Sequence, residues 1–333
     1  MTGETGQIAR LVEGLPERDH PDWIAPMLAV LTDRRFSDPG WIYERKLDGE
    51  RVVAFRDADR VRLMTRNRNE VSDTYPELAE ALAEQPVQDF VADGEVVAFD
   101  GAVSSFSRLQ GRMQIKDADA ARESGIAVYL YLFDLMHLAG HDLTGLPLRQ
   151  RKAALVEAIK FDDPLRYTPH RNESGEAFFK EACRKGWEGL IAKDADAVYS
   201  QGRSRNWLKF KCAHGQELVI GGFTEPKGTR KGFGALLLGY YEDDELRYAG
   251  KVGTGFDEAF LMDFRQTLEE HRRDTSPFDG PVKEDAIWVQ PELVAQIGFT
   301  EWTDAGRLRH PRFEGLRRDK PARDVTRERA RRE

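Results

Sequence analysis

The stretch from Trp41 to Phe55, WIYERKLDGERVVAF, places a lysine and a carboxylate at a glycine turn between two strand-like apolar runs. The lysine is Lys46 and the carboxylate is Asp48. A lysine amine attacks phosphorus only after it has lost its proton, and catalytic lysines achieve this through burial or neighbouring positive charge. The same short pattern also fits an exposed hairpin turn with a solvated lysine. The rest of the sequence is therefore needed to distinguish a nucleophilic lysine from a solvated lysine in a surface turn.

Apolar and polar residues alternate beyond the lysine, as they do in half-buried strands. Residues 51–56 and 61–65, separated by the polar residues 57–60, predict a β-hairpin. Leu78 and Leu82 lie one helical turn apart and predict a helix over residues 75–84. Further strands are expected at residues 90–92, 96–99, 127–135, 189–193 and 207–211, and helices at residues 149–160 and 174–185. This mixture predicts an α+β domain.

The composition changes around residues 211–215, and short strands with glycine turns follow. They are expected at residues 218–223, 235–240 and 246–252, before one helix at residues 257–270. Short, regularly spaced strands with few helices predict a small antiparallel barrel. We therefore expect a loose lead-in at residues 1–22, a larger domain at 23–212, a β-barrel domain at 213–320 and a basic tail at 321–333.

Length and composition are those of a two-domain globular protein. The chain has 333 residues, of which 40% are hydrophobic and 32% charged. No apolar run approaches the roughly 20 residues that cross a membrane, and no secretory signal is visible. Cys183 and Cys212 suggest neither a disulfide framework nor a metal knuckle, so we expect reduced cysteines and a cytoplasmic protein.

Charge is unevenly distributed along the chain. The net charge is −8, which does not point to a nucleic-acid partner, yet the segment from Asp304 to Glu333 carries eleven Arg/Lys against six Asp/Glu. Such a segment is also typical of a solvated arm. The location of charge is therefore more informative than its sum.

Charged residues interrupt the predicted strands in a particular order. Arg66 ends one strand, Glu95 lies between two others, Phe133 ends a third, and Glu188 and Lys193 bracket a fourth. In the last strand Lys209 and Lys211 share one face, because side chains alternate along a strand. Each feature alone is typical of an exposed sheet, but together they suit a pocket lined for phosphate.

This series resembles the signature of the covalent nucleotidyltransferases, which include ATP-dependent DNA ligases, RNA ligases and capping guanylyltransferases. The likeness is strongest to the ligase module of bacterial end-joining DNA ligases and runs from Pro26 to Lys320. It includes YERKLDGER at residues 43–51, SFSRLQGRM at 105–113, LPLRQR at 146–151, GGFTEPK at 221–227, GKVGTGF at 250–256 and HPRFEGLRRDK at 310–320. It implies an adenylation domain followed by an OB-fold domain.

The resemblance also implies a role for each matching residue. Lys46 would become lysyl-AMP, Glu44 would frame the adenine, and Phe133 would stack on the base unless it is a plain core residue. Arg51 and Arg66 would contact ribose, phosphate or the DNA end. Glu95 and Glu188 would hold the ribose or a divalent metal, and Asp48 would join them, since Mg²⁺ and Mn²⁺ prefer such hard carboxylates. The implied ATP-binding set is Glu44, Leu47, Arg51, Arg66, Glu95, Phe133, Glu188, Lys193, Lys209, Lys211, Arg318 and Lys320.

The family reaction implied has three steps: adenylation of Lys46, transfer of AMP to a DNA 5′-phosphate, and attack by a 3′-hydroxyl. The partners implied are nicked or broken duplex DNA and a Ku-like end-binding protein. We expect a monomer, associated with the nucleoid, that is a stand-alone ligase or one module of a longer protein. An RNA ligase, a GTP-dependent capping enzyme and a non-catalytic DNA-end-binding scaffold remain the alternatives.

Overall fold

The computed structural model describes residues 4–212, 214–303, 305–318 and 320–328. The chain divides into two compact units, the first reaching Cys212 and the second running from Ala213 to Arg329. The described residues form a mixed α+β structure in which most strand pairs are antiparallel. Each unit is described by itself.

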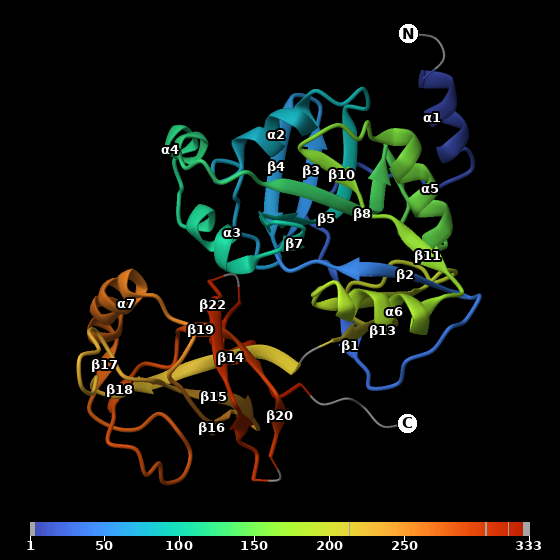
Figure 1. Ribbon diagram of the computed structural model, residues 1–333. Helices are drawn as coiled ribbons and strands as arrows, with labels where there is room; N and C mark the ends of the chain where they lie inside the picture. The colour runs from blue at the N-terminus through green and yellow to red at the C-terminus, as the bar shows by residue number, and fades with distance from the viewer. Residues whose placement is uncertain (1–3, 213, 304, 319, 329–333) are drawn as a thin grey trace. The chain divides into compact units, whose positions relative to one another are not determined.

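The first unit holds most of the helices (Figure 1). Its helices are α1 (Glu4–Val12), α2 (Pro76–Ala83), α3 (Phe106–Met113), α4 (Ala118–Glu123), α5 (Leu148–Ala158) and α6 (Gly175–Arg184). Its strands are β1 (Met27–Leu31), β2 (Trp41–Lys46), β3 (Glu50–Asp57), β4 (Arg60–Thr65), β5 (Asp89–Val97), β6 (Phe99–Asp100), β7 (Val103–Ser104), β8 (Tyr129–Leu138), β9 (His141–Asp142), β10 (Leu165–Tyr167), β11 (His170–Asn172), β12 (Gly189–Asp194) and β13 (Gly202–Lys211).

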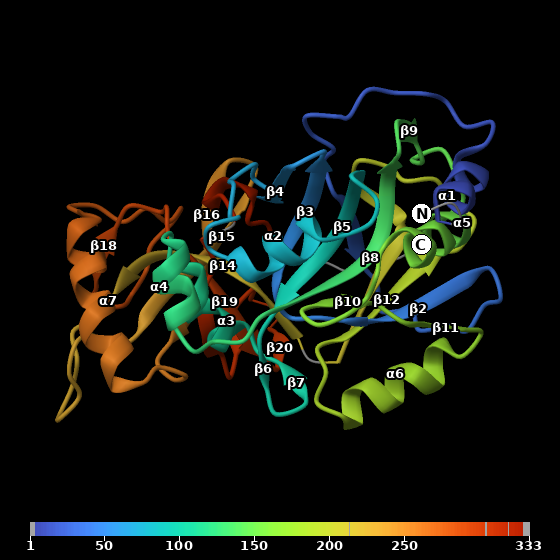
Figure 2. The same cartoon turned by 90° about the horizontal axis from the view of Figure 1, so that it is seen from above.

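One sheet of this unit has the order β10-β8-β5-β3-β4, and Figure 2 shows β3, β5 and β8 side by side. The predicted hairpin is confirmed, with Val52 of β3 opposite Thr65 of β4. Two expectations are wrong: β5 runs unbroken through Asp93 and Glu95, and β8 continues beyond Phe133 to Leu138. Asp93 stays within a strand because Arg51 on the neighbouring strand compensates its charge.

The second sheet, β1-β13-β12-β2-β11, carries Lys46 at the end of β2. In its register Gly189 of β12 pairs with both Lys46 and Lys211, and Ile191 pairs with Glu44 and Lys209. Cross-strand partners point to the same face, so β2 and β13 present these charged side chains together. Helix α6 packs along this sheet (Figure 1).

The apolar cores of the first unit explain how its two sheets and its helices pack together. One apolar cluster includes Met27, Val53, Phe133 and Trp207 and joins residues of both sheets. A second cluster packs Leu78 of α2 and residues of α5 against the β3-β5-β8 sheet. The site described below therefore rests on a buried, rigid base.

The N-terminal segment is not the loose lead-in that we expected. Val12, in helix α1, is 6% exposed and belongs to the core beside α5. Beyond the helix, the Arg18 amide donates to the Gly140 carbonyl at 2.9 Å, and the Asp142 amide donates to the Pro16 carbonyl at 3.1 Å. These contacts tie residues before Pro21 to the β8–β9 turn.

The second unit is the predicted antiparallel barrel, with one helix against it. Its elements are β14 (His214–Phe223), β15 (Leu236–Glu242), β16 (Glu245–Val252), α7 (Glu258–Glu270), β17 (Arg272–Arg273), β18 (Ile287–Val289), β19 (Val294–Phe299), β20 (Glu301–Trp302), β21 (Leu308–Arg309), β22 (Arg312–Leu316) and the 3₁₀ helix η1 (Ala322–Asp324). Strand β14 pairs with β15, β18 and β19, and β19 pairs with β22. The predicted strands and the helix are confirmed.

The segment after residue 320 is part of this unit and not a free tail. Val325 is fully buried, and the Tyr241 amide donates to its carbonyl at 2.7 Å. The Glu328 amide donates to Gln216 Oε1 at 3.0 Å. Only residues 329–333 of the expected tail lie outside the described part of the chain.

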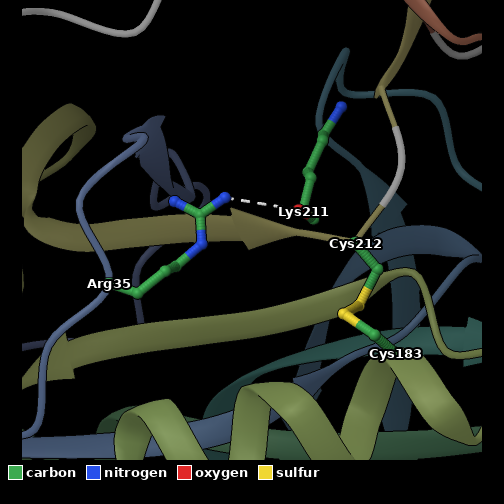
Figure 3. Close-up of a disulfide and its surroundings, with 4 residues drawn as sticks. All are labelled: Arg35, Cys183, Lys211 and Cys212. Atoms are coloured by element: carbon green, nitrogen blue, oxygen red, sulfur yellow. Dashed lines mark hydrogen bonds between the residues drawn. A yellow bond between two sulfur atoms is a disulfide. The ribbon is translucent and has the colours of Figure 1, made fainter.

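The expectation for the cysteines is also wrong, because Cys183 and Cys212 form a disulfide with a Cα–Cα distance of 5.3 Å (Figure 3). The bond joins the end of α6 to the residue after β13. The cysteines are separated by 29 positions in sequence, and only the packing of α6 on the sheet brings them together.

In the part of the chain that the structure describes, no helix is long and apolar enough to cross a membrane.

Candidate active site

The end of strand β2 carries the predicted nucleophile. Lys46 Nζ lies 2.5 Å from Glu188 Oε2, and the two side chains are 19% and 26% exposed. Glu188 reaches this position because Gly189 pairs directly with Lys46. Gly189 has a φ of +149°, and a Cβ there would lie 1.9 Å from the Phe210 carbonyl oxygen. Only glycine fits this close approach, which holds the carboxylate beside the amine.

Two further lysines continue the charged face. Lys209 and Lys211 of β13 are half-buried, and the register aligns them with Glu44 and Lys46 across β12. In Figure 3 the Lys211 side chain points away from the disulfide that follows it. The predicted row of cations on one sheet face is therefore present around Lys46.

A buried ion cluster lies beneath the nucleophile. Glu44 accepts from Lys152 Nζ at 2.5 Å through Oε1, and its Oε2 lies 2.6 Å from Lys193 Nζ. All three side chains are 3% exposed or less. Lys152, on α5, was not predicted, although it directly follows the motif at residues 146–151. It also donates to the Thr168 carbonyl at 3.2 Å.

The cluster holds one carboxylate between two ammonium groups, and this shifts the pKa values of its members. Burial raises the pKa of Glu44, but the attraction of Lys152 and Lys193 prevails and lowers it. Burial lowers the pKa of Lys193 to about 8, because Glu44 cannot fully compensate both lysines. Burial also opposes charge on Lys152, yet its contact with Glu44 leaves its pKa raised. Lys193 is thus the readily deprotonated member.

Phe133 lies between the cluster and Arg51. Its ring centroid is 4.2 Å from Lys193 Nζ and 4.5 Å from Arg51 Cζ. The ring is 7% exposed and meets Trp207 edge to face at 6.0 Å. Phe133 is therefore a core residue in this structure and also forms part of the site, while its stacking on a base stays a prediction.

Arg51 is held within the protein by a bidentate ion pair. Its Nε and Nη2 donate to Asp93 at 2.5 and 2.6 Å, and Tyr199 Oη donates to the same carboxylate at 2.6 Å. Burial lowers the pKa of Arg51, but Asp93 outweighs it and the pKa is raised. Sequence reasoning missed Asp93 as its partner, because the two are 42 positions apart.

The predicted metal ligands lie on separate segments. The amide of Asp48 donates to Ser104 Oγ at 3.1 Å, and its Oδ2 accepts from the Phe106 amide at 3.3 Å. Glu95 lies opposite Arg51 in the β3–β5 register, and Glu188 contacts Lys46 as described. Among the described residues these three carboxylates do not form one close group of ligand atoms, so their joint binding of a hard divalent cation stays a prediction.

The remaining predicted residues lie around or apart from this group. Leu47 is 8% exposed, and Arg66 is half-buried just after β4. Arg318 and Lys320 belong to the second unit, where Arg318 is exposed and Lys320 Nζ lies 3.1 Å from Glu217 Oε2. Within the first unit, the structure brings together Glu44, Lys46, Phe133, Glu188 and Lys193, with Arg51 beside them.

A lysine paired with a carboxylate on a cationic sheet face, followed by a barrel unit, defines a nucleotidyltransferase-type enzyme. Two family models match this chain: "ATP dependent DNA ligase domain" over residues 26–211 and "ATP dependent DNA ligase C terminal region" over residues 229–320. The chain belongs to the ATP-dependent DNA ligases, with an adenylation domain and a C-terminal OB-fold domain.

Individual relatives support the same family and show which of its members this chain is similar to. The chain is 40% identical over 320 residues to the multifunctional non-homologous end joining protein LigD of Pseudomonas aeruginosa, covering 93% of this chain and 37% of the relative. It is 37% identical over 318 residues to the LigD DNA repair protein of Mycobacterium tuberculosis, covering 92% of this chain and 40% of that protein. The chain thus spans about two fifths of these relatives. A solved mycobacterial DNA ligase D complexed with ATP and MES is 34% identical, with a TM-score of 0.66 and coverage of 92% of this chain and 98% of that one.

Proposed function

We propose that this chain seals 5′-phosphate/3′-hydroxyl breaks in duplex DNA through a lysyl-AMP intermediate, in DNA repair by non-homologous end joining. The observation that carries this proposal is the placement of Lys46 beside Glu188, with Lys209 and Lys211 on the same face. The LigD relatives support the repair pathway, and the ATP complex of the solved relative supports ATP as the nucleotide.

In the first step, Lys46 Nζ gives up a proton to Glu188, 2.5 Å away, and the neutral amine attacks the α-phosphate of ATP. A P–N bond forms while the bond to pyrophosphate breaks, and pyrophosphate leaves in line with the amine. Phosphoryl chemistry of this kind depends on positioning and charge neutralisation. Glu188 fixes the amine through its hydrogen bond, and Lys209 and Lys211 offset the negative charge of the phosphates.

In the second step, a DNA 5′-phosphate oxygen attacks the same phosphorus and Lys46 leaves. In the third, a 3′-hydroxyl attacks the 5′-phosphorus, and AMP leaves as the strand closes. The same positive face would serve each displacement, since all three pass through negatively charged phosphoryl groups.

Asp48, Glu95 and Glu188 would hold Mg²⁺ or Mn²⁺, which would supply Lewis-acid neutralisation of the phosphate oxygens. We propose that Glu44, with Lys152 and Lys193 beneath it, frames the adenine edge and that Phe133 stacks on the base. Because Glu44 is fixed by two lysines, its carboxylate is oriented before ATP arrives.

Arg318 and Lys320 are proposed to orient the departing pyrophosphate in the first step. We propose that the adenylation domain ends at Cys212 and that the OB-fold domain begins at Ala213. Arg318→Ala should then slow lysyl-AMP formation and leave the sealing of a pre-adenylated nick unchanged. Equal loss in both assays would contradict a role confined to the first step.

We further propose that the chain acts as a monomer in the cytoplasm, at the nucleoid, on breaks presented by a Ku-like end-binding protein. The test is a sealing assay on nicked and broken DNA duplexes, with ATP or GTP and with or without the cognate Ku. Sealing with ATP alone and stimulation by Ku would support the proposal. Sealing only of RNA, labelling by GTP, or DNA binding with no sealing would support an RNA ligase, a capping enzyme or a scaffold, respectively.

A further inference from the structure

A second cluster of chemically active side chains lies outside the ligase site. His20, Asp89 and His137 offer ligand atoms that all lie within 4.8 Å of one another. His20 Nδ1 is 2.7 Å from Asp89 Oδ1, and His137 Nε2 is 3.1 Å from the same oxygen. The three residues come from the N-terminal segment, the first residue of β5 and the end of β8.

The cluster is remote from Lys46. Asp89 pairs with Asp57 at one end of β3, whereas Arg51 pairs with Glu95 near the other end of the same strand. At about 3.3 Å per residue, the two ends are separated by roughly 20 Å. The cluster therefore cannot act on the nucleotide and needs a separate explanation.

The surroundings of the cluster leave room for a ligand. The ring nitrogens that face Asp89 are Nδ1 of His20 and Nε2 of His137, and these are the atoms that an ion would contact. A cavity of about 860 Å³ also opens beside the cluster, and His20, Asp89 and His141 line it together with Asp19 and Asp57.

We propose that His20, Asp89 and His137 bind a borderline transition-metal ion of the Zn²⁺ class, with water from the cavity as the fourth ligand. Two imidazoles and a carboxylate are a donor set for such an ion, whereas Mg²⁺ and Ca²⁺ prefer oxygen alone. Tetrahedral ligands of Zn²⁺ lie about 3.3 Å apart, so Asp89 and His20 need to separate only slightly when the ion replaces their shared proton. The Gly140 amide, which donates to Asp89 Oδ2 at 2.6 Å, would orient the carboxylate.

The role assigned to this ion is structural. It would join the N-terminal segment to the ends of β5 and β8. Close to His20 in the sequence, Trp23 stacks on Phe55 of β3, with 6.1 Å between the two ring centroids. Binding would stabilise the folded state by a free energy that grows with the logarithm of the ligand concentration above the Kd.

The test is titration of the metal-free full chain with Zn²⁺, and with Co²⁺ as a spectroscopic probe, in excess Mg²⁺. The Mg²⁺ would saturate sites formed by oxygen ligands, including the proposed carboxylates near Lys46, and would leave an imidazole site open. The wild type should bind one equivalent with a visible Co²⁺ spectrum typical of four-coordinate geometry. His20→Ala and Asp89→Asn should weaken binding at least 100-fold, while His310→Asn, a histidine of the second unit, should change nothing.

A second readout separates metal binding from folding. Zn²⁺ should raise the thermal midpoint of the wild type and of His310→Asn, but not that of His20→Ala. His20 lies outside any helix or strand, so this variant should fold. No stoichiometric binding by the wild type, or equal binding by His20→Ala, would overturn the proposal. Neither readout depends on lysyl-AMP formation, so failure of the metal site is distinguishable from failure of the proposed function.

Discussion

Lys46 Nζ and Glu188 Oε2 lie 2.5 Å apart, although the two residues are separated by 142 positions in sequence. The pairing of Gly189 with Lys46 brings them together, and the tight approach of Gly189 to Phe210 fixes that register. Glu188 directly precedes strand β12, so the carboxylate that orients the amine is held at the end of the sheet. This relationship is the structural basis for assigning Lys46 as the nucleophile.

Replacing this carboxylate tests the relationship. Glu188→Gln should lower the rate of lysyl-AMP formation by about 100-fold or more, because the amine loses its charged partner. The rate is measured with labelled ATP in single-turnover reactions. Glu181→Gln is a matched control, since Glu181 pairs with Arg171 and Lys185 on the exposed face of α6. Equal rates for Glu188→Gln and the wild type would remove Glu188 from the site.

The buried cluster around Glu44 should make stability depend on pH. Lys193 has a pKa of about 8 in the folded state, against an ordinary value of 10.5. Below pH 8 Lys193 is protonated in both the folded and the unfolded chain, and the folded state bears the full free-energy cost of burying that charge. Between pH 8 and 10.5 only the unfolded chain keeps the proton, so stability rises with pH.

Lys193→Met should therefore be at least as stable as the wild type at pH 7, and its advantage should shrink as the pH rises toward 10. Lys152→Met removes a group that also satisfies the Thr168 carbonyl, so it should destabilise the protein at both pH values. Denaturant unfolding at pH 7 and pH 9.5 measures both effects. A Lys193→Met variant that is markedly less stable at pH 7 would show that Glu44 needs both lysines.

The Arg51–Asp93 pair should contribute strongly to stability. Asp93 is fully buried and also accepts from Tyr199, so Asp93→Asn leaves the Arg51 cation without compensation. We expect a loss of about 3 kcal/mol in the free energy of unfolding. Asp163→Asn, which breaks the exposed pair with Arg166, should cost much less, because solvent screens an exposed pair. Similar losses in the two variants would mean that burial does not increase the contribution of the Arg51–Asp93 pair to the free energy of unfolding.

The disulfide predicts a stability difference between oxidised and reduced protein. Joining Cys183 to Cys212 closes a loop of 29 positions, which should stabilise the first unit by about 3 kcal/mol. Unfolding of the oxidised and reduced wild type, with Cys183→Ser as a variant that cannot form the bond, measures this. The variant should match the reduced protein and be insensitive to reductant. Two free thiols in the protein purified without reductant would contradict the pairing.

Much of the fold was predictable because strand periodicity is local. The hairpin of β3 and β4, strands β12 and β13 beside Lys46, and the first three strands of the second unit were predicted from patterns over a few residues, whereas β17–β22 were not predicted. The predicted strand breaks near Asp93 and Phe133 were wrong because they depend on contacts that are not local in the sequence. Whether a charged residue can remain inside a buried strand depends on a distant partner such as Arg51.

The same limit applies to the site. Lys46, Glu188 and the β13 lysines were named through a pattern; the structure places the three lysines on one sheet face and Glu188 beside Lys46. Lys152 was missed because it sits on a helix, with no periodic signal that it points toward Glu44. The disulfide was missed because it depends on packing between distant segments.

The assignment of Lys46 as the nucleophile can be checked by incubating the protein with α-labelled ATP and Mg²⁺, followed by a denaturing gel. The wild type and Lys185→Ala, an exposed-lysine control, should retain label, whereas Lys46→Ala should carry none. The label should not form from GTP. Absence of label in the wild type after pyrophosphate has removed any bound AMP, or persistence of label in Lys46→Ala, would contradict this assignment.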